Sequence, residues 1–92
     1  MSPPESITIL HVDDDRQFGE LTQLMLERNC EEFEVITETD PREVERLLDE
    51  RDVDCLVTDS EMPHINGVEL LKRVRDRNSS LPVILCTSKS VS

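Results

Sequence analysis

Carboxylates or hydroxyls follow three apolar runs of this sequence. In chain order they are Asp13 with Asp14, Asp59, and Thr87 with Ser88. If the runs are parallel strands, their carboxyl ends meet at one edge of a sheet, and the acidic side chains gather there if the first strand lies beside the third. Three carboxylates in one place repel one another, unless a hard divalent cation such as Mg²⁺ binds their oxygens or one acid has a raised pKa. With a metal and a hydroxyl donor beside it, the chemistry that fits is phosphorylation of an aspartate.

The elements that would position these groups can be recognised from composition. Four runs have the character of β-strands: Ile7–Val12, Glu32–Thr37, Val53–Thr58 and Leu81–Cys86. The second alternates acidic and apolar residues at first, which is typical of a strand at an edge or with one wet side. Helical patterns separate the runs, so we expect right-handed βαβ units and one doubly wound parallel α/β sheet, preceded by a loose tail over residues 1–6.

The first helical pattern begins directly after the three consecutive aspartates. Asp15 is expected to cap this helix, which makes it a structural residue, and Asn29 lies near the helix end. The apolar residues recur at helical spacing and predict a stripe that packs in the core, made of Phe18, Leu21, Leu24 and Met25.

Two further helices carry recognisable start signals. Asp40 precedes Pro41, and Glu43 stands three residues after the expected cap, which approximates a capping box. Asn66 and Glu69 repeat that spacing. The predicted buried faces are Val44, Leu47 and Leu48 in the first of these helices and Leu70, Leu71 and Val74 in the second.

Composition limits the classes of partner. The 92 residues carry 21 acidic and 10 basic side chains, a formal charge of −11, which argues against nucleic acid or an anionic membrane as a direct partner and favours cations. The basic residues are eight Arg and two Lys. The excess acid fits adaptation to high salt or ordinary solubility, and the sequence leaves both interpretations open.

Three cysteines, Cys30, Cys55 and Cys86, include no C-x-x-C pair, so they indicate neither a disulfide framework nor a zinc site. Cys55 and Cys86 lie in apolar runs, where a thiol serves as a small hydrophobe. The sequence shows no signal-peptide pattern and no apolar segment of membrane-spanning length. We therefore expect a soluble protein in the reducing cytoplasm.

Both histidines are expected to be passive. His11, in the first strand, has no second His or Cys at metal-ligand spacing, and we expect it to pack or hydrogen-bond within the strand. His64 lies in the loop after Asp59 and is expected to be exposed, because attack by an ionised carboxylate needs no general base.

Three segments of the chain, taken together, resemble the receiver domains of two-component response regulators: Val12–Asp15, Asp59–Gly67 with its Met-Pro step, and Thr87-Ser88. The resemblance covers residues 7–88. It implies a flavodoxin-like sheet with strand order 2-1-3-4 over residues 7–92. It also implies Mg²⁺-dependent phosphorylation within a phosphorelay, with a histidine kinase or phosphotransfer protein as the donor.

The resemblance also assigns roles at the site. It implies Asp59 as the phosphoacceptor and a metal site made by Asp13, Asp14, Asp59 and the backbone carbonyl of Glu61. Thr87 would be the switch hydroxyl. Any enzymatic activity would be limited to Mg²⁺-dependent self-phosphorylation and autodephosphorylation on Asp59.

The sequence departs from the receiver pattern after Thr87. Receiver domains continue with a helix, a fifth strand and a last helix, and a lysine at the end of the fifth strand contacts the phosphoryl group. Lys89, two residues after Thr87, is not assigned that role. Without these elements the fourth strand would be an apolar edge and the first helix would lack cover on one side. We expect either a partial receiver domain or another chain, such as a second copy in a homo-oligomer, that supplies the cover.

Two other functions stay open at this point. A receiver-like interaction module would keep the fold and the acidic pocket without being phosphorylated. A phosphatase of the haloacid-dehalogenase type also places an Asp-x-Asp, here Asp13 and Asp15, after a first strand, although this chain is short for that class.

Overall fold

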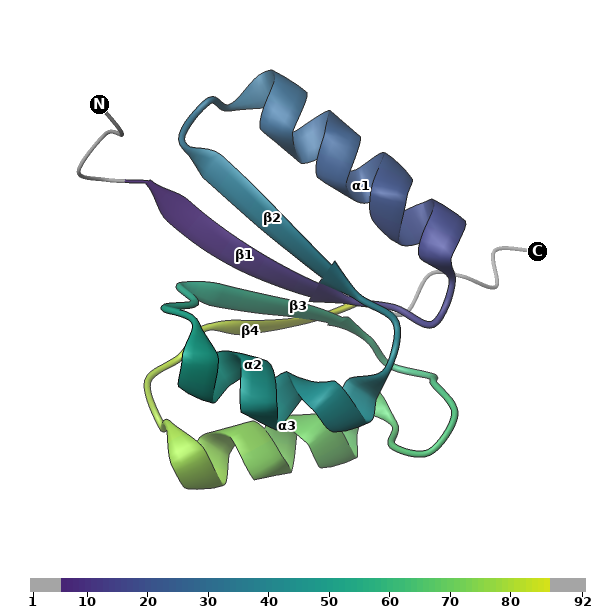
Figure 1. Ribbon diagram of the computed structural model, residues 1–92. Coiled ribbons are helices and arrows are strands. Elements are labelled where there is room, and N and C mark those ends of the chain that lie inside the picture. Colours follow the sequence, from purple (N-terminus) through teal and green to yellow (C-terminus); the bar gives the residue numbers. More distant parts are fainter. Residues whose placement is uncertain (1–5, 87–92) are drawn as a thin grey trace.

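Four parallel strands form one sheet in the order β2-β1-β3-β4 (Figure 1). The structure, a computed structural model, describes residues 6–86, so residues 1–5 of the predicted tail and Thr87, Ser88 and Lys89 lie outside it. Every neighbouring pair of strands is parallel, so the carboxyl ends meet at one edge as predicted. The strands are β1 (Ile7–Val12), β2 (Phe33–Glu38), β3 (Cys55–Asp59) and β4 (Val83–Cys86).

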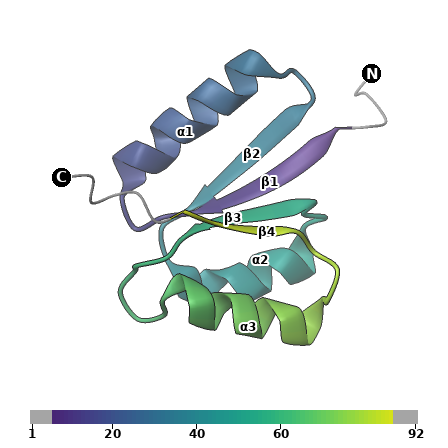
Figure 2. The same cartoon turned by 180° about the vertical axis from the view of Figure 1, so that it is seen from behind.

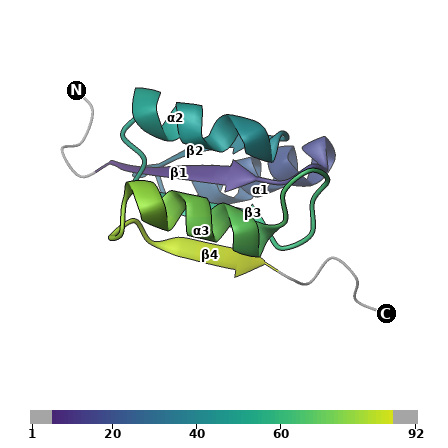
Figure 3. The same ribbon diagram turned by 90° about the horizontal axis from the view of Figure 1, so that it is seen from below.

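Helices cover both faces of this sheet. They are α1 (Arg16–Asn29), a 3₁₀ turn η1 (Pro41–Glu43), α2 (Val44–Glu50) and α3 (Gly67–Arg77). Figures 1 and 2 show α1 on one side and α2 with α3 on the other, and Figure 3 shows the latter two in front of the sheet. Among residues 6–86, no helix combines the length and apolarity of a membrane span.

The buried core lies between the sheet and helices α2 and α3. Leu10 of β1 pairs in register with Leu56 of β3, and both are fully buried. Residues of α2, α3 and the adjoining loops complete the cluster, which consists of Leu10, Val12, Val44, Leu56, Ile65, Leu70, Val74 and Leu81. The predicted inward faces of α2 and α3 are confirmed at Val44, Leu70 and Val74.

Side-chain caps begin two of the three α-helices where the sequence predicts them. The Asp15 carboxylate accepts a hydrogen bond from the Phe18 amide at 3.2 Å, and Asn66 accepts one from the Glu69 amide at 2.8 Å. The expected capping box at Asp40 is wrong in detail. Asp40 accepts from the Arg42 amide at 2.9 Å, and Pro41–Glu43 forms a 3₁₀ turn before α2 begins.

The predicted core stripe of α1 is exposed, so that prediction is wrong. The side of α1 that contacts the sheet carries the buried Gly19. Gln23 donates to the Val35 carbonyl at 3.0 Å and Glu27 accepts from the Val35 amide at 2.9 Å, so these polar residues hold α1 against β2. The four stripe residues are 43–57% exposed: Phe18, Leu21, Leu24 and Met25.

Candidate functional site

Three carboxylates, those of Asp13, Asp14 and Asp59, meet at the carboxyl edge of the sheet. Each offers an oxygen atom, and the three atoms lie within 4.8 Å of one another. Asp13 and Asp59 are only 3% and 4% exposed, whereas Asp14 is exposed. Acids more than forty positions apart in the sequence are therefore brought together, as the parallel-sheet argument predicts.

Backbone amides hold the two buried carboxylates in place. Asp13 follows β1 directly, its amide donates to the Glu38 carbonyl of β2 at 3.0 Å, and its Oδ1 accepts from the Asp15 amide at 2.9 Å. Asp59 ends β3, and its Oδ1 accepts from the Glu61 amide at 3.3 Å. In both cases the amide two positions later in the chain fixes the carboxylate, an arrangement typical of Asp in turns.

The donor set fits Mg²⁺. All three side chains provide hard oxygen ligands. Asp13 and Asp14 follow β1 and Asp59 ends β3, so a cation there would join the ends of these two strands. The Glu61 backbone lies beside this group, because its amide contacts Asp59. A role for the Glu61 carbonyl as a ligand stays a prediction.

Two neutral side chains border the carboxylates. Burial lowers the pKa of His11, and the charges of Asp13 and Asp59 oppose part of that shift. Burial raises the pKa of the Cys86 thiol, and the same two carboxylates raise it further. The Cys86 thiol is therefore a poor competitor for electrophiles, since the thiolate is the reactive form. Sequence reasoning did not place Cys86 at the site, although its position before Thr87 was a usable signal.

The loop from β3 to α3 passes very close to the site. A side-chain carbon at Gly67 would lie 2.6 Å from the Asp59 carbonyl oxygen and 2.8 Å from the Ser60 Cα, so only glycine fits there. His64 is exposed, as predicted, with a φ of 74°, a backbone conformation that favours glycine or asparagine. The loop is anchored by Ile65, which is 5% exposed and belongs to the core.

Other predicted residues are not brought into the cluster. Asp15 is exposed and caps α1, so the Asp-x-Asp arrangement expected of a haloacid-dehalogenase phosphatase gains no support here. His11 is 3% exposed and packs with its ring centroid 6.0 Å from that of Phe18, which confirms the prediction of a packed strand residue. Thr87 lies outside the described residues, and β4 ends at Cys86, the register partner of Asp59.

Curated proteins that resemble this chain include transcriptional regulatory proteins of bacteria. Transcriptional regulatory protein CpxR of Escherichia coli K12 is 40% identical over 81 residues, which cover 88% of this chain and 33% of CpxR. The alkaline phosphatase synthesis transcriptional regulatory protein PhoP of Bacillus subtilis is 32% identical over 81 residues, with the same coverage of 88% and 33%. This chain thus spans about a third of the length of these relatives.

Solved receiver domains share the fold. The receiver domain of Francisella response regulator 1452 superposes with a TM-score of 0.80 at 27% identity, covering 94% of this chain and 69% of that one. A structure of histidine kinase ThkA in complex with response regulator protein TrrA contains a match with a TM-score of 0.82 at 28% identity, covering 92% of this chain and 72% of the other.

A family model described as the response regulator receiver domain matches residues 9–92. That span includes all three clustered carboxylates and the whole parallel sheet from Ile9 onward. The chain therefore belongs to the response regulator receiver domains of two-component signalling systems, and its fold is the flavodoxin-like receiver fold.

Proposed function

We propose that this receiver domain accepts a phosphoryl group on Asp59 in a Mg²⁺-dependent transfer from a histidine kinase or phosphotransfer protein. The observation that carries the proposal is the position of Asp59. It is a nearly buried carboxylate at the end of a central strand, with an oxygen atom within 4.8 Å of oxygens from two further aspartates. A lone cap or turn residue would not need such neighbours.

Each residue of the cluster has a role in this proposal. Asp13, Asp14 and Asp59, with the carbonyl of Glu61, hold Mg²⁺. When bound, Mg²⁺ neutralises charge on the phosphoryl oxygens. The Thr87 hydroxyl donates to the phosphoryl group once it is attached.

The transfer itself needs one nucleophile and one leaving group. A carboxylate oxygen of Asp59 forms a bond to phosphorus while the bond from phosphorus to the donor imidazole nitrogen breaks, and the imidazole leaves with that electron pair. The amide of Glu61 orients the Asp59 carboxylate through Oδ1. Asp59 attacks as an ionised group, so the exposed His64 is not required as a base.

The partners follow from family and charge. One of the structural relatives is a response regulator in complex with a histidine kinase, which supports a kinase as the donor for this chain. The net charge of −11 argues against direct contact with nucleic acid or an anionic membrane. The proposed location is the reducing cytoplasm, which suits three cysteines that indicate no disulfide framework.

Phosphorylation by a small acyl phosphate tests the proposal. The full chain is incubated with acetyl phosphate and either Mg²⁺ or EDTA, and intact-mass spectrometry counts the phosphoryl groups. We expect one phosphoryl group in Mg²⁺, none in EDTA and none on Asp59→Asn. Asp76→Asn makes the same chemical change on the exposed surface of α3 and should be phosphorylated like the wild type.

The three functions that the sequence leaves open predict different outcomes. No phosphoryl group on the wild type, with the fold intact by circular dichroism, would mean an interaction module. A phosphoryl group that survives Asp59→Asn would move the acceptor to another aspartate, as expected of the phosphatase class. Either result overturns the assignment of Asp59.

A further inference from the structure

β2 is an edge strand of the sheet. Among residues 6–86, β1 flanks it on one side and no strand flanks it on the other. β4, from which the chain continues, lies at the opposite edge (Figure 3). The edge of a sheet is a template on which a further strand can add, because its outward amides and carbonyls can pair with another backbone.

The backbone of β2 points alternately toward β1 and toward the outer edge. The amide of Asp13, directly after β1, donates to the Glu38 carbonyl at 3.0 Å, so Glu38 and every second residue before it bond toward β1. The residues between them direct both amide and carbonyl to the opposite side. Val35 and Thr37 therefore present these groups at the outer edge, and Val35 lies near the middle of the strand.

Two side chains of α1 occupy the outer edge at Val35. Gln23 Nε2 donates to the Val35 carbonyl at 3.0 Å, and Glu27 Oε2 accepts from the Val35 amide at 2.9 Å. An added strand would supply the same two partners, one donor and one acceptor. Gln23 and Glu27 are one helical turn apart, so α1 takes the place of a strand at this point.

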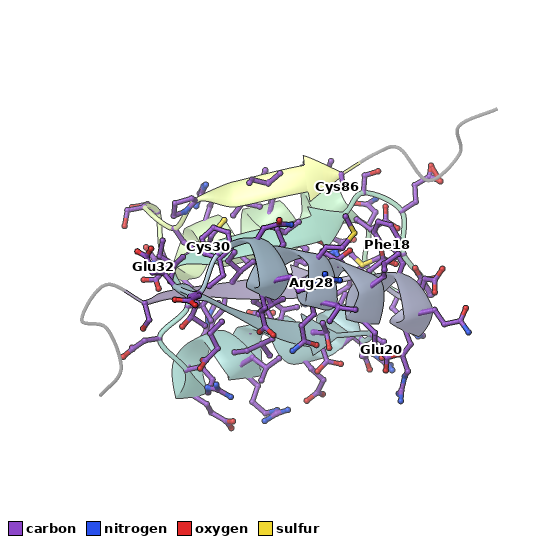
Figure 4. All side chains as sticks on the ribbon, turned by 90° about the horizontal axis from the view of Figure 1, so that it is seen from above. Phe18, Glu20, Arg28, Cys30, Glu32 and Cys86 are labelled. Carbon is purple, nitrogen blue, oxygen red and sulfur yellow. The ribbon has the colours of Figure 1, made fainter. Side chains whose placement is uncertain are left out.

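These two residues lie on the side of α1 away from its exposed apolar residues. Figure 4 looks onto α1 and shows Phe18 on the side toward Cys86 of β4 and Glu20 on the opposite side. Gln23 and Glu27 follow Glu20 by three and seven residues, which is the spacing of one helix face. The contacts with β2 are therefore separate from the exposed apolar face of α1.

We propose that Gln23 and Glu27 close the outer edge of β2 against strand addition by a second copy of this chain. The element that they exclude is β2 of that copy. In an antiparallel pair about a two-fold axis centred on Val35, the two Val35 residues would exchange amide and carbonyl hydrogen bonds. The strand is rich in the β-branched and aromatic residues that favour such pairing.

Amide hydrogen exchange at Val35, resolved by NMR on the full chain, tests the proposal together with sedimentation equilibrium. Both are measured over a range of protein concentrations in 0.5 M KCl, where screening limits repulsion between copies to less than about 5 Å. The Val35 rate is expressed relative to that of Leu10 in β1, which reports general stability. In the wild type this ratio should not change with concentration, even where copies associate through another surface.

Gln23→Ala combined with Glu27→Ala should open the edge. At low concentration the Val35 amide should exchange roughly tenfold faster or more, because it loses a hydrogen bond to a charged group. At high concentration its exchange should slow again, and the mass should exceed that of the control, as β2 pairs with a second copy. The matched control, Gln17→Ala with Glu20→Ala, removes the same residue types from exposed positions of α1 that do not bond to Val35.

Two further variants separate the contacts from charge and from loss of fold. Glu27→Gln keeps an acceptor oxygen for the Val35 amide, so its edge should stay closed although a charge is lost. Circular dichroism of each variant confirms that the fold is kept. If the double variant loses helix, Gln23→Glu replaces it, because this change sets an acceptor against the Val35 carbonyl, and Gln17→Glu is then its control.

Three results would overturn the proposal. A wild-type Val35 amide whose relative exchange slows with concentration would mean that the edge is open with both side chains in place. An edge variant that exchanges and sediments like its control would mean that Gln23 and Glu27 do not protect the edge. A Val35 amide that exchanges faster in the variant at every concentration would mean that the opened edge adds no second copy.

Discussion

The fold holds the carboxylates of Asp13 and Asp59 close enough to repel each other. Both are nearly buried, and their ligating oxygens lie within 4.8 Å of each other. Two unit charges at that distance repel by roughly 3 kcal/mol at an effective dielectric constant of about 20. A backbone amide stabilises each carboxylate in part. A cation bound by these oxygens would lower the repulsion between them, so a binding function fits these residues well.

His11 gives a pH dependence to stability in the absence of metal. The imidazole is 3% exposed, and its Nδ1 has no hydrogen-bond partner within the described part of the chain. Burial lowers the pKa of folded His11, so the unfolded chain binds the proton first as the pH falls. We expect the free energy of unfolding, measured by urea denaturation in EDTA, to decrease as the pH is lowered through about 6.5.

His11→Val tests whether this residue is the cause. The substitution removes both the titration and the buried polar atom, so it should stabilise the protein by about 1 kcal/mol at pH 7 and flatten the pH dependence between about pH 7 and 5.5. His64→Asn removes the exposed histidine at a backbone position that asparagine tolerates, and it should leave the slope as in the wild type. If the pH dependence of the free energy of unfolding is unchanged in His11→Val, other titrating groups cause the loss of stability at low pH.

Much of the site was predictable at the level of single residues. Asp13, Asp14 and Asp59 could be grouped from sequence because parallel strands bring their carboxyl ends together, once the strand order was taken from the receiver resemblance. The uncharged side chains that border these carboxylates, His11 and Cys86, could not be placed there from sequence. The pKa shifts of His11 and Cys86 arise from burial and from cross-strand distances, which depend on strand register.

At the level of elements, α1 shows where periodicity is insufficient. The spacing of Phe18, Leu21, Leu24 and Met25 correctly identified a helix but indicated the wrong buried face. The side of α1 against the sheet is instead set by the small Gly19 and by Gln23 and Glu27, whose polar ends bond to the backbone of the edge strand β2. An apolar stripe shows which face prefers burial, but within residues 6–86 no element covers this one.

Substitution by alanine should change the stability of the protein in opposite directions at the two glycines of the chain. Gly67 begins α3, and a Cβ there would collide with the backbone of Asp59 and Ser60 at 2.6 and 2.8 Å. Gly67→Ala should therefore destabilise the protein by roughly 1–3 kcal/mol and displace the loop beside Asp59. Its urea midpoint should fall, and phosphorylation by acetyl phosphate should slow.

Gly19→Ala is the matched control inside a helix. Its Cβ would lie 3.8 Å from His11 Nδ1 and from Thr37, which is an ordinary contact distance. Alanine is the better helix former, so this variant should be more stable than the wild type by about 0.5–1 kcal/mol. Equal effects of the two substitutions would show that the close approach of α3 to β3 does not constrain Gly67.

For the whole molecule, stability comes mainly from one side of the sheet. The eight residues of the core cluster come from β1, β3, α2, α3 and the loops beside them, whereas α1 contributes only Gly19 as a buried residue. A chain of 92 residues with such a one-sided core has little stability to lose. Repulsion among its 21 acidic side chains should therefore have a measurable effect.

We expect the stability of this chain to rise with salt. The Debye length falls from about 10 Å at 0.1 M to about 3 Å at 1 M, so simple screening of the −11 charge is nearly complete by 1 M KCl. The urea midpoint should increase up to that concentration. A continued rise above it would favour adaptation to high salt, a plateau would favour acidity for solubility, and a midpoint that is flat from dilute buffer upward would rule out a role for the net charge.

Two double variants separate net charge from specific ion pairs. Glu31→Gln with Glu32→Gln neutralises two exposed acids that form no ion pair among residues 6–86, and it should raise stability in dilute buffer and reduce the salt dependence. Glu43→Gln with Glu50→Gln removes the same charge but also breaks contacts of 2.7 and 3.0 Å with Arg46. The second variant should gain less, because the lost attraction offsets part of the relieved repulsion. If both variants gain equal stability, the ion pairs of Arg46 contribute nothing measurable and the gain comes from the lower net charge.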